Sequence, residues 1–403
     1  MADNKQNTNP NVPNLRFPEF KEDWERTQLN HYLEENKERN KRGLFNKNDV
    51  LSVSGDFGIV NQIELLGRSF AGKSVLDYHI VRSGNIVYTK SPLKEYPYGI
   101  VKINKGVDGI VSTLYAVYNV KENADGRFIE FYFELPNRIN RYFKPIVRIG
   151  AKHDMKIGND EVLANNVVFP CLAEQMRISN LITLLNKRIA TQNKIIEDLK
   201  KLKVAICNKY LNKGEQSVKL GEIGSFIRGL TYSSNDINEN QCGTIVLRSN
   251  NIVNGESINF NDIVWVNKTP LTEQVLRDGD IVICMANGSS SLVGKSSYYS
   301  KEKEMPTTVG AFCGIFRPNH SAAKWLFQTT HYKQSINKYL QGGNGAIANV
   351  YPEDILSISF NIPSNIKLVI EALEILESKI IQEQKYQNRY TTLKSYLLQQ
   401  MFI

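Results

Sequence analysis

Residues 170–211 read PCLAEQMRISNLITLLNKRIATQNKIIEDLKKLKVAICNKYL, and residues 363–403 read PSNIKLVIEALEILESKIIQEQKYQNRYTTLKSYLLQQMFI. Each stretch begins at a proline and continues with no further proline or glycine, so it contains no helix-breaking residue. Apolar residues recur in both at alternating spacings of four and three, which is typical of a long helix that packs lengthwise on another helix. We therefore predict two long amphipathic helices that form a coiled coil.

The second predicted helix repeats the first, because adding 191 to each seam position in the first stretch gives a seam position in the second. Gln192, Glu383 and Gln387 are polar seam positions near the middle, where a buried polar residue can fix the register at a cost in stability. The alternative is that each helix packs only on its own domain. The predicted seam consists of Ile178, Ile182, Leu185, Ile189, Gln192, Ile196, Leu199, Val369, Leu373, Leu376, Ile380, Glu383, Gln387 and Tyr390.

Each predicted helix follows a mixed segment of about the same length, and 403 residues are enough for two domains with separate cores. The first helix would carry the chain to the second domain, and the second helix would return antiparallel to the first. The two domains would then be related by a pseudo-twofold axis. We predict an α+β chain with a disordered N-terminal lead at residues 1–14, mixed α/β domains at residues 15–169 and 214–362, and spacer helices at residues 170–213 and 363–403.

Short sequence matches also relate the two mixed domains. Runs of β-branched and aromatic residues between glycines and asparagines predict short strands joined by long loops, with a short strand at residues 62–66 and one run at residues 111–118. Residues 36–79 and 228–275 share little, so a common scaffold carries unlike loops, as expected of two modules that bind two different targets. The matching segments are Arg82–Val87 with Arg277–Val282, Ile139–Phe143 with Ile336–Leu340, and Ile157–Leu163 with Val350–Leu356.

Composition narrows the class of protein. The formal net charge of +9 makes a polyanion a reasonable partner, although charge alone is a weak signal. The five cysteines form no CxxC pair, which argues against a disulfide framework or a zinc site and favours a reducing compartment. No apolar run approaches the length of a membrane span. The histidines are isolated and no nucleophile–base or amino-methyltransferase motif is present, so we predict that the chain is not an enzyme by itself and binds no metal.

One motif suggests a different function. Residues 67–74 read GRSFAGKS and match GxxxxGK[ST], the loop whose backbone N–H groups cradle the phosphates of a nucleotide. The residues that follow look extended rather than helical, and no later segment offers a convincing magnesium ligand. A P-loop nucleotide-binding protein is the alternative function. In the competing interpretation the segment is a loop whose Arg68, Lys73 and Ser74 face a DNA backbone.

The divergent loops are rich in residue types that contact nucleic acid. Arginine and asparagine can read base edges, and lysine, serine and threonine suit phosphates. Each such residue taken alone is more simply a solvent-exposed loop side chain, but two such loops on duplicated scaffolds favour DNA. The candidate DNA-binding residues are Lys41, Arg42, Lys47, Asn48, Arg68, Lys73, Ser74 and Lys90 in the first domain, and Arg228, Thr231, Tyr232, Arg248, Ser249, Asn250, Asn251, Asn287, Ser289, Ser290 and Lys295 in the second.

Several segments in the same order carry a family resemblance: RFPEFKEDW at residues 16–24, YPYGIVKIN at 96–104, GIVSTLYAVY at 109–118, PCLAEQMRISNLITLLNKRI at 170–189 and VKLGEIGSFIRG at 218–229. Through them the chain after residue 14 resembles the specificity (S) subunits of type I restriction–modification systems. The family's spacer helix opens with P-x-x-x-E-Q-x-x-I, which is carried here by Pro170, Glu174, Gln175 and Ile178. The second copy departs from this pattern, with Lys367 and Leu368 where Glu-Gln is expected.

The resemblance implies that the chain is a non-catalytic DNA-recognition and scaffold subunit. Its mixed domains would be target-recognition domains that each read half of a bipartite, asymmetric site, with the helices as a ruler between them. It would assemble on double-stranded DNA with two modification (M) subunits, which use S-adenosylmethionine to methylate adenine. Restriction (R) subunits, expected to be two, would add translocation and cleavage driven by ATP with magnesium. The chain itself would bind no cofactor and no membrane, and would lie in the bacterial cytoplasm, on the nucleoid when bound to DNA.

Overall fold

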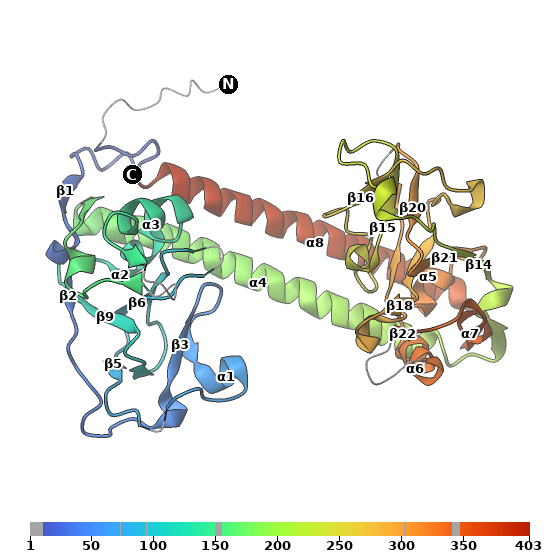
Figure 1. The fold of residues 1–403 in the computed structure, drawn as a ribbon, viewed down its shortest axis with the longest axis horizontal. Coiled ribbons are helices and arrows are strands. Elements are labelled where there is room, and N and C mark those ends of the chain that lie inside the picture. The colour runs from blue at the N-terminus through green and yellow to red at the C-terminus, as the bar shows by residue number, and fades with distance from the viewer. Residues whose placement is uncertain (1–10, 73, 94–95, 150–154, 302–303, 341–346) are drawn as a thin grey trace. The chain divides into compact units, whose positions relative to one another are not determined.

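The computed structural model describes residues 11–72, 74–93, 96–149, 155–301, 304–340 and 347–403 (Figure 1). The chain divides into two compact units, which we call unit 1 and unit 2. Unit 1 contains Met1–Gln192 and Tyr386–Ile403, and unit 2 contains Asn193–Lys385. The two long helices, α4 (Leu172–Tyr210) and α8 (Ile366–Gln400), each contribute one part to each unit.

Unit 1 is built on a four-stranded sheet with the strand order β2-β9-β6-β7 and three separate two-stranded sheets around it, β1-β12, β3-β4 and β5-β8, besides the small β10-β11 pair. Its strands are β1 (Glu25–Gln28), β2 (Leu33–Glu35), β3 (Leu51–Ser54), β4 (Gly58–Asn61), β5 (His79–Val81), β6 (Ile86–Thr89), β7 (Val101–Ile103), β8 (Gly109–Val111), β9 (Tyr115–Val120), β10 (Arg148–Ile149), β11 (Met155–Lys156) and β12 (Asn166–Phe169). Its short helices are α1 (Gln62–Leu66), α2 (Gly126–Tyr132) and α3 (Pro136–Phe143).

A core rich in aromatic residues joins the four-stranded sheet of unit 1 to its helices. The ring of Tyr88 on β6 stacks on Phe143 of α3 with 4.4 Å between the ring centroids, and Phe128 of α2 packs edge-on against Trp24. Ile178 and Ile182 from the first part of α4 belong to the same buried cluster as Leu397, Leu398, Met401 and Phe402 from the end of the chain. Because the beginning of α4 meets the end of α8, the two helix segments run antiparallel within this unit.

Unit 2 contains a four-stranded sheet with the order β14-β21-β17-β19 and a three-stranded sheet with the order β16-β15-β20. Its strands are β13 (Gln216–Lys219), β14 (Gly224–Arg228), β15 (Thr244–Leu247), β16 (Val264–Val266), β17 (Ile281–Cys284), β18 (Ala286–Asn287), β19 (Ser296–Tyr298), β20 (Thr307–Val309), β21 (Cys313–Pro318), β22 (Ala348–Asn349) and β23 (Ser359–Ile362). Its short helices are α5 (Ala323–Leu326), α6 (Thr330–Tyr339) and α7 (Pro352–Ser357).

The helix segments of unit 2 are also antiparallel, because Cys207 near the end of α4 and Leu211 directly after it share a buried cluster with Val369, Ile370 and Leu373 at the beginning of α8. Across the helices the predicted seam positions are buried or partly buried, including the polar Gln192 at 4% exposed and Glu383 at 8%. The predicted α+β class with two long helices is confirmed.

The duplication seen in the sequence extends to atomic detail. The hairpin β6–β7 pairs Ile86 with Ile103, and the hairpin β17–β19 pairs Ile281 with Tyr298, so both pairs of positions differ by 195. Each hairpin begins after a tight turn in which a side chain accepts a hydrogen bond from a backbone N–H: Asn85 Oδ1 from Arg82 at 2.7 Å, and Asp280 Oδ2 from Arg277 at 2.8 Å. The matching sequences therefore build the same turn twice.

Two sequence predictions about local structure are wrong. Residues 62–66 form helix α1 instead of a strand, because the Asn61 side chain caps its first N–H groups and Gly67 ends it in a left-handed conformation, with φ +74°. Residues 111–118 are not one strand. Ser112 accepts a hydrogen bond from the N–H of Tyr115 in a turn that separates β8 from β9.

Candidate DNA interface

The motif that opens the first long helix fastens α4 to the domain before it. The carboxylate of Glu174 is fully buried and accepts two hydrogen bonds from the guanidinium of Arg16, at 2.8 and 2.7 Å. The Gln175 side chain donates to Pro170 O at 2.9 Å and accepts from the N–H of Asp125 at 3.0 Å. The Glu-Gln pair therefore fixes where the helix begins on unit 1.

In unit 1 the candidate residues after β2 lie on an exposed loop. Lys41, Arg42, Lys47 and Asn48 are all exposed. The loop is held from inside by Asn40, whose fully buried amide donates to the backbone oxygens of residues 45 and 75 and accepts from the N–H of residue 45. Lys41 forms an ion pair with the exposed carboxylate of Asp77, so a phosphate that contacted Lys41 would also lie close to that negative charge.

The structure gives the GRSFAGKS segment a different shape from a P-loop. A P-loop lies between a strand and a following helix, but Gly67 follows helix α1, and the described residues up to Val75 form no helix. Arg68 and Ser74 are exposed, and the Arg68 guanidinium lies 4.6 Å from the centre of the Phe70 ring. Lys73 lies outside the described residues. Nothing in this geometry supports the nucleotide-binding alternative.

Lys90 has a structural role in unit 1. Its ammonium group donates to Ile157 O at 3.1 Å and to the Asn159 side chain, and burial lowers its pKa. Through these hydrogen bonds Lys90, which is partly buried, holds the segment before η3 (Glu161–Leu163). The contact of Lys90 with DNA stays a prediction, and in this conformation its ammonium group is bonded within unit 1.

In unit 2 the candidates from residue 248 onward lie on a turn organised by a buried amide. Asn251 is fully buried. Its side chain accepts a hydrogen bond from the N–H of Arg248 at 2.8 Å and donates to Asn259 O and Asn261 O, each at 2.9 Å. Asn251 therefore shapes the loop and has no exposed surface for a direct contact with DNA, which corrects its place among the predicted contact residues.

Arg248 and Asn250 share an acidic partner that the sequence did not reveal. The Arg248 guanidinium lies 3.1 Å from Asp262 Oδ2, and the Asn250 amide donates to the same oxygen at 2.6 Å. Asp262 has φ +54°, so its carboxylate is presented by an unusual backbone conformation. This carboxylate therefore positions both candidate side chains.

A second group of unit 2 candidates gathers beside that turn. Asn287 Nδ2 donates to Ser249 Oγ at 3.3 Å, and Lys295 Nζ donates to Ser249 O at 3.3 Å. Ser289 donates through its N–H to Asn287 Oδ1 at 3.0 Å, and Ser290 is exposed. The structure therefore joins two segments that lie about 40 residues apart in the sequence into one polar surface.

The remaining unit 2 candidates lie at the end of strand β14 and directly after it. Arg228 and Thr231 are exposed, whereas the Tyr232 ring packs partly against the buried Leu230, Val246 and Val266. Lys268 donates to Thr231 O at 2.7 Å, which adds a positive charge that the sequence interpretation did not include.

In the described parts of the chain, no cluster of histidine, cysteine, aspartate and glutamate has the geometry of a metal site. Among the helices that the structure describes, none is both long and apolar enough to cross a lipid bilayer.

The sequence and the fold were also compared with those of known proteins. No protein-family model matches the chain. The specificity subunits of the type I restriction enzymes StySPI from Salmonella potsdam and EcoKI from Escherichia coli (strain K12) are each 31% identical to it over 179 residues, 42% of this chain and 38% of the relative. The match therefore spans well under half of the length of these curated relatives.

Solved structures with the same fold extend over nearly the whole chain. The S subunit of a type I restriction–modification system from M. genitalium has a TM-score of 0.56 and 14% identity, covering 97% of this chain and 99% of that one. A chain from a structure of the assembly and conformational transition of the type I R-M system has a TM-score of 0.52 and 14% identity, covering 93% and 96%. Sequence and fold thus agree, and they confirm the resemblance of this chain to the specificity subunits of type I restriction–modification systems.

Proposed function

We propose that this chain is the DNA-recognition and scaffold subunit of a type I restriction–modification complex. The observation that carries the proposal is the duplicated scaffold with unlike loops. The hairpins β6–β7 and β17–β19 share one register. Residues 36–79 and 228–275, in contrast, have different sequences. Two copies of one framework that present different polar surfaces suit a site with two different halves.

Unit 1 reads one half-site through the loop that contains Lys41, Arg42, Lys47 and Asn48 and through Arg68 and Ser74. Unit 2 reads the other through Arg228, Thr231 and Tyr232 and through the surface of Arg248, Ser249, Asn250, Asn287, Ser289, Ser290 and Lys295. In this proposal the exposed lysines contact phosphates, and the arginine and asparagine side chains held by Asp262 contact base edges.

The long helices provide the docking surface for two M subunits. Besides its buried seam, α4 exposes Leu184 (64%), Ile195 (40%) and Leu202 (49%). The positions 191 residues later on α8 are Ile375 (72%), Tyr386 (37%) and Leu393 (45%), which are also exposed. Exposed apolar side chains repeated at equal spacing offer the same surface twice, as two identical partners require.

In the assembled complex, the M subunits would bind S-adenosylmethionine and methylate adenine after the base is extruded from the helix. Two R subunits would use ATP and magnesium to translocate and cleave unmodified DNA. The chain described here would bind none of these cofactors and would work in the bacterial cytoplasm, on the nucleoid when the complex is bound to DNA.

An exchange of domains tests the proposal. Replacing residues 36–164 by the corresponding span of a related chain should change one half of the recognised sequence and leave the other half and the gap unchanged. Replacing residues 228–355, a span that also contains the unit 2 candidates from Asn287 to Lys295, is the matched control and should change the opposite half. The measurement is binding of the M-containing complex to duplexes in which each half-site is varied separately. A change at both half-sites in either exchange would contradict two independent readers.

A further inference from the structure

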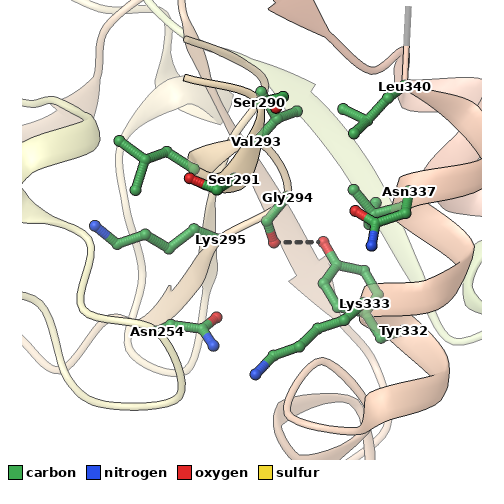
Figure 2. Close-up of a pocket in the computed structure, with 12 residues that line it drawn as sticks. Asn254, Ser290, Ser291, Val293, Gly294, Lys295, Tyr332, Lys333, Asn337 and Leu340 are labelled. Carbon is green, nitrogen blue, oxygen red and sulfur yellow. Dashed lines mark hydrogen bonds between the residues drawn. The ribbon is translucent and has the colours of Figure 1, made fainter. Parts of the chain in front are cut away.

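Unit 2 contains a pocket of about 610 Å³ beside its candidate DNA interface (Figure 2). The floor is formed by the buried residues Val293, Gly294, Tyr332 and Ile336. The rim consists of Asn254, Ser290, Ser291, Leu292, Lys295, Lys333, Asn337 and Leu340. Its volume falls within the range of about 300–1,000 Å³ that is usual for small-molecule sites.

The duplication explains why the pocket is open in unit 2. The strand pairs β6–β7 and β17–β19 match with an offset of 195 at both strands. The segment between β6 and β7 is therefore as long as the segment between β17 and β19. Ser291 and Val293 therefore stand where unit 1 has Tyr96 and Tyr98, and both tyrosines pack against the core of unit 1. Two aromatic side chains in one copy correspond to a serine and a valine at the pocket in the other.

The floor of the pocket is packed closely on helix α6. Gly294 has φ +77°, and a Cβ atom at this position would lie 2.6 Å from Cγ2 of Ile336 on α6. Tyr332 Oη donates to Gly294 O at 3.0 Å, the contact drawn as a dashed line in Figure 2. The backbone at Gly294 therefore lies directly on helix α6.

The chemistry of the lining favours an anion with an apolar part. Among the described residues that line the pocket, Lys295 and Lys333 are the only charged ones, so no carboxylate is present in this part of the lining. In Figure 2 the Asn254 side chain lies between the two ammonium ends, and Ser290 and Ser291 lie on the opposite side. Hydroxyl and amide groups on the rim above an apolar floor suit a group with polar edges and an apolar face.

We propose that this pocket binds one nucleotide, with the phosphate near Lys295 and Lys333 and the base over the apolar floor. The nucleotide comes either from the strand of bound DNA, unstacked from its neighbours, or from free nucleotide in solution. The first source rests on the proposed function. The pocket is continuous with that surface, because Lys295 donates to Ser249 O and Ser290 belongs to both.

Two pairs of variants test the pocket in the full-length chain. Ser291→Tyr introduces the side chain that unit 1 has at the same position, and Ser217→Tyr on the exposed side of β13 is its control. Lys333→Ala removes one pocket charge, and Lys338→Ala on the same helix α6, outside the pocket lining, is its control. Ser291→Tyr fills the pocket, whereas Lys333→Ala leaves the pocket open and removes a phosphate contact.

Two binding measurements separate the sources. The purified chain is titrated with adenosine 5′-monophosphate and, separately, with inorganic phosphate. The M-containing complex is titrated with a duplex containing its recognition site. For a free nucleotide, we expect the monophosphate to bind more tightly than phosphate and to lose at least tenfold in affinity with Ser291→Tyr and about tenfold with Lys333→Ala. For a strand nucleotide, the same variants should weaken duplex binding by similar factors, and both controls should match wild type.

The proposal is overturned if neither measurement responds to Ser291→Tyr and Lys333→Ala. If the wild-type complex still binds its divided site in that case, the pocket proposal fails and the proposed function stands. If the wild-type complex binds no specific DNA site at all, the proposed function fails. The titration with adenosine 5′-monophosphate then tests the pocket proposal by itself. Monophosphate binding that is absent, or that Ser291→Tyr and Lys333→Ala leave unchanged, would overturn the pocket proposal too.

Discussion

Lowering the pH should loosen the part of unit 1 that carries its candidate contact loop, because His79 is buried in the neutral form. His79 lies on β5 and is 1% exposed. Burial, reinforced by the charges of Arg39 and Lys90, lowers its pKa from 6.5 to about 4. Arg39, at the root of the loop of Lys41 and Arg42, forms a β-bridge with His79.

The direction and size of the effect follow from the two pKa values. Below pH 6.5 the unfolded chain binds a proton that the folded chain does not take up until about pH 4. The free energy of unfolding is therefore at its full value above pH 6.5 and falls as the pH decreases. The loss is about 2 kcal/mol at pH 5 and about 3 kcal/mol below pH 4.

Hydrogen exchange measured by mass spectrometry can follow this loss locally. Between pH 7 and pH 5, after correction for the chemical exchange rate, protection of β5 and its partner β8 should fall about 20-fold. His79→Leu should abolish this fall, and His31→Gln, at an exposed site of the same unit, should retain it. Equal protection at both pH values in the wild type, or a fall that persists in His79→Leu, would refute the reasoning.

Three further perturbations test other parts of the account. Glu377→Ala leaves the buried Lys203 ammonium without the carboxylate 3.5 Å away and should destabilise unit 2 by about 3 kcal/mol in chemical unfolding, whereas the exposed neighbour Glu374→Ala should have little effect. Lys47→Ala should lower the slope of log K against log salt for DNA binding by about 0.9; an unchanged slope would remove Lys47 from the phosphate contacts. Inserting two helical turns near Gln192 should change the gap between half-sites or abolish binding, and an active variant with an unchanged gap would contradict the ruler.

The long helices and the repeat could be predicted because both depend on local pattern. The alternating spacing of four and three, with no interrupting proline or glycine, identified α4 and α8, with bounds that differ by a few residues from Leu172–Tyr210 and Ile366–Gln400. The turn before β6 could be found by comparing the chain with itself. Helix α1 was predictable as well, because an asparagine cap and a following glycine are helix signals, but its short apolar run favoured a strand.

The candidate interface could be predicted only by residue type. Asparagine suits DNA, yet Asn251 is fully buried and bonded to three backbone groups, which depends on how residues 248–261 fold back on themselves. Asp262 and the pocket of unit 2 were missed for the same reason. The carboxylate reaches Arg248 and Asn250 across a turn, and the pocket joins Asn254, Ser291 and Lys333 from separate elements. Such contacts are set by tertiary structure, and no local periodicity encodes them.

The most direct test of the central claim is a base-resolution map of adenine methylation in cells with and without this gene. A DNA-recognition subunit with two different readers predicts that deletion removes methylation at one motif, made of two unlike half-sites with a fixed gap. Restoring the gene with residues 36–164 exchanged should then return a motif that differs in one half only. An unchanged map on deletion, in cells whose M subunits are present and active, would contradict the account.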